Sequence, residues 1–527
     1  MKKCSKFTRA LALLLVAVMS LSACSQGGTS SQSGTASQSG TTSQGSNADP
    51  VAHDNDIVVA VAADISGFDP TALSSLYNQT VLWQMYDRLY ELDEEKKPVP
   101  HLAKEAEMVS DTEWVISLVE EAKFSDGSDV TANDVKVCLD RAIACGLGGA
   151  IFAPLQSVEV VDEHTIKINT SSLYPQLPIA LTNLITCILP ASYIEQAEAS
   201  GDWTQPITSG RYKLKERVVG ESVTLIPNEY FWDESTAAKN DSLTFRVVPE
   251  ASTRTIMVQT GEADLNTEFS TADYEIAAAD PNVKIYEHES SVMTFMPLDC
   301  QTEYFGNEKV REAMQYAIDR ESVLLVQANG YGTVNYSYIS PTCYGWLDNP
   351  GGYSYDPEKA KELLAEAGYA DGFTFDLYCT SAFTPAATLI QSNLAEVGIT
   401  ANIQMMESVD EIVSRAVDGN MPACITTWGC NPDPALVLER NIGESALGAY
   451  NVSRYVNEEL EELWQYGSIS ENVEDRIPYY EQWQEILCEA NPWVPLYVGE
   501  LFALANADLQ GVQLNTEQCY NFYDLHY

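Results

Sequence analysis

The alternation of strand-like and helix-like segments over residues 356–406 constrains the fold more than any other feature of the sequence. In "YDPEKAKELLAEAGY", Asp356 can cap a helix, Pro357 suits the first helical position, an apolar stripe follows at helical spacing, and Gly368 ends the pattern. Alternating apolar residues at 373–377 then predict a strand, and the same helix-then-strand order repeats up to "ITANIQM". This order predicts an α/β fold in which helices cover a mostly parallel sheet.

The first part of the chain carries similar signals. The run "IVVAVAA" from Ile57 predicts a buried strand, residues 77–90 predict a helix, and alternation over 114–118 predicts a half-buried strand. Thr131 and Asp134 in "TAND" have the spacing of a capping box, so a helix is expected to begin there. Because 527 residues exceed what one hydrophobic core usually covers, two or three domains are expected.

Charge and motif content argue against several classes of function. The chain has 29 basic and 76 acidic residues and a net charge of -47, so nucleic acid and anionic membrane surfaces are poor partners. It lacks the GxSxG, P-loop, GxGxxG, HExxH and EF-hand patterns, and its five histidines are scattered singly. We therefore expect no enzyme activity, no cofactor and no metal site.

The N-terminus is typical of an exported chain. Basic residues precede an apolar run over 10–19 that is too short to span a bilayer, and the segment ends in "LSAC" at Cys24. This ending is similar to a bacterial lipobox, which implies a signal peptide at 1–23 and a lipid on the Cys24 sulfur; an ordinary signal peptide is the alternative. Residues 24–49 form a Ser/Gly/Thr/Gln-rich tether, expected to be a flexible coil. We expect an extracytoplasmic protein that this lipid anchors to the cell membrane.

The cysteines after Cys24 form no CxxC pair. Several lie in apolar runs, as Cys187 does in "LITCILP", so most are expected to be buried small hydrophobic residues rather than metal ligands. Cys424 and Cys430 are close enough in sequence to form a disulfide, but pairing cannot be deduced from sequence. Free thiols are the interpretation that we favour.

Five stretches resemble segments of a known family and occur in the family's order. They are "KFSDGSDVTANDV", "DWTQPITSGRYKLKE", "RVVPEASTRTIMVQTGEADL", "VREAMQYAIDRE" and "DPEKAKELLAEAGY". Each one alone is a turn with a capped helix or an amphipathic core helix, but together they extend the likeness over nearly all of residues 57–527. The family is that of the large extracellular solute-binding lipoproteins of peptide- and nickel-type ABC transporters, which includes the oligopeptide- and dipeptide-binding proteins.

The resemblance implies a two-lobed clamp of the periplasmic-binding-protein kind, with mixed sheets flanked by helices and three domains. The expected domains are lobe one at 50–97, 201–300 and 498–527, an inserted small domain at 98–200, and lobe two at 301–497. The lobes are expected to close on a solute about hinge strands near 300 and 497.

The resemblance also implies a function. The protein would be a monomeric receptor of an ABC importer that captures short peptides and delivers them to a membrane permease and its ATPase. One alternative keeps this role for another solute: an oligosaccharide, a metal chelate or an opine-like cation. A surface-tethered hydrolase of peptides or glycans, and a sensory or adhesion lipoprotein without a transporter, are further alternatives.

The stretch "TTWGCNPDPAL" is the main candidate site. In peptide-binding members, a Trp-x-x-Asp segment lines the cleft: backbone groups beside the indole pair with the peptide, and the aspartate binds its ammonium group. Here Trp428 and the backbone of Thr427 and Gly429 match, but Asn431 replaces the acid and carries no full charge. Asp433, in a turn with two prolines, supplies that charge if it points into the cleft; otherwise it caps the turn and faces water.

The opposite wall of the cleft is expected to come from lobe one. The loop around Tyr77 and Asn78 corresponds to it in the family, so these two residues complete the predicted ligand-binding set.

Overall fold

The computed structural model describes most of the chain. The described residues are 55–72, 75–93, 97–145, 152–417, 419–430, 432–434, 441–447, 450–470, 472–514 and 520–527. The chain divides into two compact units, Met1–Ala52 and His53–Tyr527, and all described residues belong to the second. The signal peptide, Cys24, the tether and Asn431 lie outside the described residues. Within the described part, no helix combines the length and apolarity needed to span a bilayer.

The largest sheet has nine strands and is mixed. Its order is β17–β12–β18–β11–β1–β10–β9–β8, and β13 pairs with β18. The bounds are β1 Asp56–Val61, β8 Tyr212–Val218, β9 Ser222–Pro227, β10 Ser242–Val247, β11 Leu265–Asn266, β12 Val283–Pro297, β13 Gly332–Val334, β17 Thr426–Gly429 and β18 Trp493–Asn506. Among the described strands of this sheet, the parallel pairs are β1 with β10 and β1 with β11. The expectation of a mostly parallel sheet is therefore wrong for this sheet, because hairpins and long antiparallel strands build most of it.

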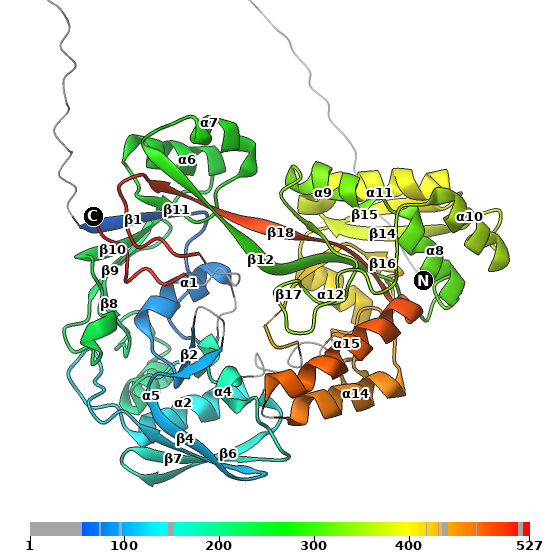
Figure 1. Ribbon diagram of the computed structural model, residues 1–527. Helices are drawn as coiled ribbons and strands as arrows, with labels where there is room; N and C mark the ends of the chain where they lie inside the picture. The colour runs from blue at the N-terminus through cyan, green and yellow to red at the C-terminus, as the bar shows by residue number, and fades with distance from the viewer. Residues whose placement is uncertain are drawn as a thin grey trace, which may run out of the picture. The chain divides into compact units, whose positions relative to one another are not determined.

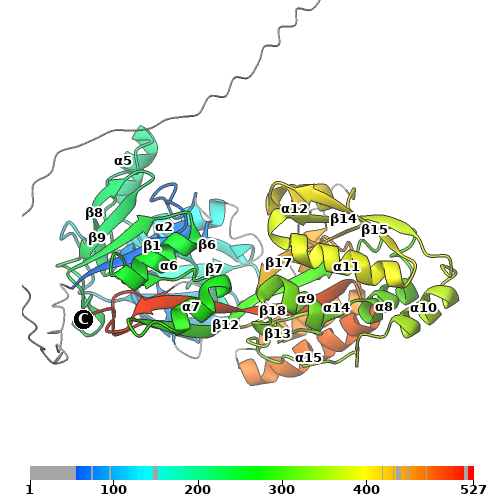
Figure 2. The same ribbon diagram turned by 90° about the horizontal axis from the view of Figure 1, so that it is seen from above.

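Two long strands connect different hydrophobic cores. Strands β12 and β18 pair along nearly their whole length, and both views show them side by side (Figures 1 and 2). The start of β18 packs into one core through Val494 and Leu496, and its end packs into another through Ala503 and Ala505. The pairing has an irregularity between Glu289 and Met293 of β12. These two strands are thus the covalent and hydrogen-bonded link between the two cores.

Three smaller sheets complete the β structure. A four-stranded sheet, β4–β5–β7–β6, is antiparallel, β2 pairs with β3, and a three-stranded sheet has the order β15–β14–β16. Their bounds are β2 Tyr90–Leu92, β3 Pro98–Pro100, β4 Ala103–Ser110, β5 Glu113–Leu118, β6 Leu155–Asp162, β7 Thr165–Thr170, β14 Thr374–Thr380, β15 Thr400–Met406 and β16 Ala423–Cys424. The three-stranded sheet is parallel throughout, which confirms the prediction from residues 356–406.

Helices pack on these sheets and often begin at the predicted caps. The α-helices are α1 Leu76–Met85, α2 Ala132–Ala144, α4 Leu177–Ala180, α5 Ala191–Ser200, α6 Ala251–Thr260, α7 Tyr274–Ala278, α8 Glu308–Ala317, α9 Arg320–Ala328, α10 Pro357–Glu366, α11 Thr384–Glu396, α12 Val409–Val417, α14 Glu458–Ile469 and α15 Val473–Ala490. Asp356 accepts a hydrogen bond from the Lys359 N–H, and Asp134 accepts one from the Thr131 N–H. Both predicted helix starts are therefore confirmed.

The helix predicted over 77–90 is shorter than expected. Helix α1 ends at Met85, and the chain is extended at Tyr86. The Met85 carbonyl accepts a hydrogen bond from Gly210, and the Asp87 carbonyl accepts one from Ile188. Helical hydrogen bonding stops here because the backbone pairs with distant segments instead, which a local pattern does not reveal.

Candidate functional site

Strand β17 lies at one edge of the nine-stranded sheet. The Cys430 N–H donates to the Ser291 carbonyl (3.1 Å), which fixes the alternation of the antiparallel ladder between β17 and β12. Hydrogen-bonded positions alternate along an antiparallel strand, so Trp428, two residues before Cys430, also hydrogen-bonds to β12 through its backbone. The N–H and C=O groups of Thr427 and Gly429 instead point away from β12. Within the described residues β17 pairs with β12 alone. The backbone groups of Thr427 and Gly429 therefore form an open strand edge.

The indole of Trp428 is half-buried beside this edge. Its ring centroid lies 5.8 Å from that of Trp493 and 6.5 Å from that of Phe295, with the Trp493 pair arranged edge to face. Phe295 belongs to β12 and Trp493 to β18, so the indole packs on the strands that link the two cores. This packing holds the Trp428 indole in a fixed position beside the open edge.

The turn that follows β17 holds Asp433 inside the protein. Asp433 is 2% exposed, and its Oδ2 lies 2.7 Å from Nη2 of Arg476. Its Oδ1 accepts a hydrogen bond from the Tyr480 hydroxyl (2.7 Å). Both partners belong to α15, and the nearby Pro432 carbonyl accepts a hydrogen bond from the Tyr344 N–H. The alternative that Asp433 caps the turn and faces water is therefore wrong. Binding of an ammonium group by Asp433 stays a prediction.

Tyr77 and Asn78 lie at the start of α1 but have different surroundings. Asn78 is 1% exposed, and its Oδ1 accepts hydrogen bonds from the hydroxyls of Ser75 and Ser66 and from the Ser66 N–H. It therefore fixes the loop after β1. Tyr77 is half-buried, and its hydroxyl donates to Glu268 (3.0 Å). Burial and the neighbouring Glu268 raise the pKa of Tyr77 from 10.0 to about 12, so the hydroxyl keeps its proton at neutral pH.

Two small surface hollows meet at Tyr77. Both are lined by Val61, Tyr77 and Thr80; one also includes Glu268, and the other is mostly apolar. They lie where the parallel strands β1, β10 and β11 end, which is the usual place for a ligand in such sheets. Glu268 was missed from the sequence because it is one of 76 acidic residues. Its position two residues after the short strand β11 is the sequence feature that could have indicated a place at the end of the sheet.

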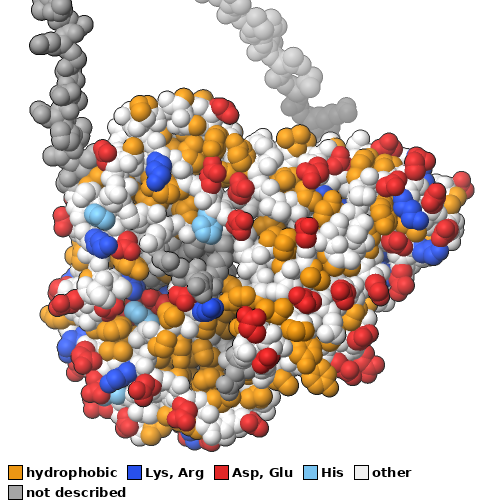
Figure 3. Space-filling view, in the orientation of Figure 1, with side chains coloured by type: hydrophobic (Ala, Val, Ile, Leu, Met, Phe, Trp, Pro, Cys, Tyr) orange, Lys and Arg blue, Asp and Glu red, His pale blue; other side chains and the backbone are white. Residues whose placement is uncertain are grey.

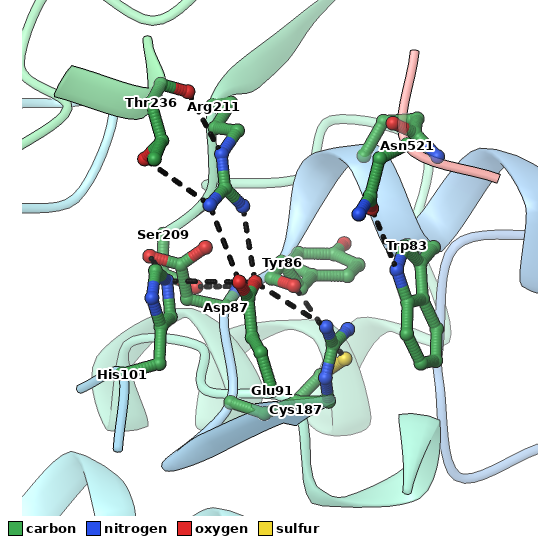
Figure 4. Close-up of polar contacts among 12 residues, drawn as sticks. Trp83, Tyr86, Asp87, Glu91, His101, Cys187, Ser209, Arg211, Thr236 and Asn521 are labelled. Atoms are coloured by element: carbon green, nitrogen blue, oxygen red, sulfur yellow. Dashed lines mark hydrogen bonds and ion pairs between the residues drawn. The ribbon is translucent and has the colours of Figure 1, made fainter. Parts of the chain in front are cut away.

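A second polar cluster lies near the end of α1, where Asp87, Glu91, His101 and Arg211 meet (Figure 4). Arg88 also contacts Glu91 there. Both Nη atoms of Arg211 donate hydrogen bonds to the Glu91 carboxylate, at 3.0 and 3.3 Å. The Nε2 atom of His101 lies 3.0 Å from Asp87 Oδ2 and 3.6 Å from Glu91 Oε1. All of these groups are buried except Glu91, which is partly exposed.

The charges of this cluster shift the pKa values of its members. Burial opposes ionisation of Glu91, but the charges of His101, Arg211 and Arg88 outweigh it and lower the pKa of Glu91 to about 2. Burial likewise acts to lower the pKa of His101, but Asp87 and Glu91 outweigh it and raise the pKa above the usual 6.5.

The same cluster has the spacing of a metal site but not its charge balance. One ligand atom each from Asp87, Glu91 and His101 lies within 4.8 Å of the others. The charges of Arg88 and Arg211, both paired with Glu91, balance those of the two carboxylates, so the cluster offers a divalent cation no net negative charge. We therefore interpret the cluster as an ion-pair network that joins β2, the segment after β3 and the start of β8.

Most of the described cysteines are free thiols. Among them are Cys138, Cys145, Cys187, Cys300, Cys379, Cys424, Cys430 and Cys488. Cys424 and Cys430, the pair considered from sequence, are both buried and unbridged, which agrees with the interpretation that we favoured. Burial raises the pKa of Cys424 to about 12, so its thiol is unreactive at neutral pH.

An open strand edge beside a fixed indole, together with hollows at the ends of parallel strands, suits a protein that binds an extended solute. The comparisons with known proteins agree with this class. The chain belongs to the bacterial extracellular solute-binding proteins, family 5, whose "Middle" model matches residues 97–445. The family suggested by the five sequence stretches is thereby confirmed.

Relatives and solved structures extend this likeness to most of the chain. The glutathione-binding protein GsiB of Salmonella paratyphi A is 27% identical over 494 residues, which cover 90% of this chain and 95% of the relative. Heme-binding protein A of Haemophilus influenzae is 30% identical over 369 residues, or 68% of this chain and 67% of the relative.

Among solved structures, HbpA2 from Haemophilus parasuis superposes with a TM-score of 0.79 at 24% identity and covers 89% of this chain and 99% of that one. The periplasmic binding protein DppA from Helicobacter pylori, in complex with the peptide STSA, gives 0.78 at 24% identity, with 89% and 97% covered. The fold is thus the two-lobed periplasmic-binding-protein fold, as predicted.

Proposed function

We propose that this protein is the extracytoplasmic receptor of an ABC importer and that it captures short peptides. The observation that carries the proposal is the open edge of β17, where Thr427 and Gly429 present backbone donors and acceptors beside the Trp428 indole. An extended peptide can add to such an edge as a further strand, with its main chain satisfying these groups. The relatives named for glutathione and for a bound peptide support this class of solute.

The predicted binding residues take different roles in this proposal. Thr427 and Gly429 bind the peptide main chain, and Trp428 packs against it. Tyr77 lines the wall from lobe one, while Asn78 shapes that wall through the loop after β1. Asn431 stays a predicted ligand outside the described residues. Asp433 is proposed to orient the turn after β17 from inside, because its carboxylate is occupied by Arg476 and Tyr480.

The domain division is part of the same proposal. Lobe one comprises 50–97, 201–300 and 498–527, the small domain 98–200 and lobe two 301–497. Support comes from the cores, because one core gathers residues of the first two domains and another gathers residues of the third. Closure is expected to bend β12 and β18, which are the strands shared by both cores.

Anchoring and partners complete the proposal. A lipid on Cys24 and the tether at 24–49 keep a monomeric receptor at the outer face of the membrane, where the closed form meets the permease and ATPase. The chain acts by binding alone, without cofactor, because the relatives are named as binding proteins and its polar clusters are ion pairs rather than catalytic groups.

Native mass spectrometry of protein purified without refolding tests the peptide assignment. Retained masses that fragment as peptides, together with calorimetric binding of the same peptides, are the expected result. Retention of heme, an oligosaccharide or a metal chelate, with no binding of di- to pentapeptides, would contradict the peptide assignment and leave the receptor role. Hydrolysis of the added peptides would contradict the receptor role itself.

A further inference from the structure

Glu268 occupies an unusual place among the many carboxylates of this protein. It lies two residues after the end of β11, a short strand parallel to β1, so it shares an edge of the sheet with the loop after β1. Figure 3 shows Asp and Glu side chains spread widely over the face drawn, exposed to solvent. Glu268, in contrast, is only partly exposed and lines a hollow with Tyr77 and Thr80.

The contacts of Glu268 fix its position and leave acceptor capacity unused. One carboxylate oxygen accepts a hydrogen bond from the Ala62 N–H (2.8 Å), and the other accepts one from the Tyr77 hydroxyl (3.0 Å). An ionised carboxylate has about four acceptor positions on its two oxygens. The two neutral donors therefore hold the group in place without neutralising its charge.

No ion pair within the described residues includes Glu268. The nearest basic side chain with a contact to this residue is Arg254, whose guanidinium donates to the carbonyls of Val248 and Pro249 and, more weakly, to the Glu268 backbone carbonyl (3.4 Å). Arg254 is 4% exposed, so it is held below the surface by backbone groups. The side-chain carboxylate of Glu268 thus keeps a position for a cation that arrives from outside.

The adjoining hollow makes the surroundings of Glu268 apolar on one side. It shares Tyr77 and Thr80 with the Glu268 hollow, and apolar side chains dominate its lining, among them Val61, Val81 and Phe245. Each hollow has a volume of about 10 Å³, which is room for about one water molecule. The Glu268 hollow can therefore take a group as small as an ammonium, and a hydrogen bond formed there is stronger than one in bulk water.

We propose that Glu268 binds the protonated amino group of the solute. The inference rests on the proposed peptide function and names its preferred class: short peptides with a free amino terminus. Glu268 then supplies the negative charge that Asn431 lacks. The Asp433 carboxylate is instead paired with Arg476.

Calorimetry with the tripeptide Leu-Ala-Ala and its N-acetyl derivative tests the inference. The native protein should bind the free amine about 10- to 100-fold more tightly, which is the range for a hydrogen bond between charged groups. Glu268→Gln keeps the shape and should abolish this preference while leaving affinity for the acetylated peptide unchanged. Glu262→Gln, an exposed carboxylate close in sequence, should behave like the native protein.

A second variant tests whether the charge carries the preference. Glu268→Asp keeps the negative charge on a shorter side chain and should retain part of the preference for the free amine, whereas Glu268→Gln should lose it. If Glu268→Gln retains the preference, the amine is bound elsewhere and this inference fails, while peptide capture stands. If the native protein binds neither form, both the peptide function and this inference fail.

Discussion

Replacing Asp433 by Asn tests whether this carboxylate orients the turn after β17 or binds the solute. The Arg476 guanidinium lies 2.7 Å from Asp433, and the two side chains are 7% and 2% exposed. Removing one partner of a buried ion pair costs about 3–5 kcal/mol, because the remaining charge is left without compensation. The Asn side chain offers one oxygen to two donors, Arg476 and the Tyr480 hydroxyl, so one donor loses its acceptor.

Hydrogen exchange measured by mass spectrometry is the assay that suits this change. If the turn opens locally, a loss of about 3–5 kcal/mol accelerates hydrogen exchange about 150- to 5000-fold in peptides covering 426–434 and 473–490. Unfolding of the whole chain is a poorer measure, because a protein with several cores need not unfold in one step. The double variant Asp433→Leu, Arg476→Met replaces both charges by apolar groups and should restore much of the protection.

Peptide binding then separates the two roles of Asp433. If the carboxylate only orients the turn, Asp433→Asn should weaken free and N-acetylated Leu-Ala-Ala by the same factor, because the whole β17 edge is disturbed. If Asp433 binds the ammonium group, the loss should be confined to the free amine. Unchanged exchange in both peptide regions would refute the reasoning about the buried pair, whatever happens to affinity.

Three further changes have definite expectations. Arg211→Met should lower the free energy of unfolding in urea by about 3 kcal/mol, because it leaves the Glu91 carboxylate without its bidentate partner. Lys213→Met, two residues further along the chain and in a more exposed ion pair, should lower it by less than about 1 kcal/mol. His101→Asn should be destabilised most, relative to the native protein, below pH 6.5, because only in the folded state do Asp87 and Glu91 stabilise protonated His101. The difference should shrink as the pH rises through the raised pKa of His101, and an equal difference at every pH would contradict this. Thr427→Pro removes an N–H at the open edge and should weaken peptide binding about 2- to 12-fold in calorimetry with little loss of stability, and unchanged affinity would argue against strand addition.

Local sequence signals predicted the elements well because their causes are local. The Asp356 cap, the proline after it and the Gly368 stop act within one helix, and the structure has that helix at Pro357–Glu366. The same reasoning overextended the helix from residue 77, because its end is set by backbone pairing with segments more than one hundred residues away. Local patterns predicted a mostly parallel sheet for the same reason, whereas the mixed sheets implied by the family resemblance are confirmed.

The site was predictable only where the family pattern or a short segment carried the information. Thr427, Trp428 and Gly429 were expected from the family pattern, but the open strand edge that they form follows from pairing with β12, which is more than one hundred residues earlier in the chain. Glu268 contacts Ala62 across 206 positions, and Arg211 contacts Glu91 across 120. Among 76 acidic residues, a pattern cannot indicate which carboxylate meets which partner.

The large negative charge of the chain and the choice of solute are separate matters. At physiological ionic strength the field of exposed charges decays over about 8 Å, so a net charge of -47 attracts cations generally and selects none. Selection requires a carboxylate that is fixed in position and partly shielded from water, beside a surface that recognises the rest of the solute. Asp433 is shielded but already paired, whereas Glu268 is fixed by two neutral donors and faces a hollow. The difference between these two residues lies in their partners rather than in their chemistry, and the partners decide which of them can discriminate between solutes.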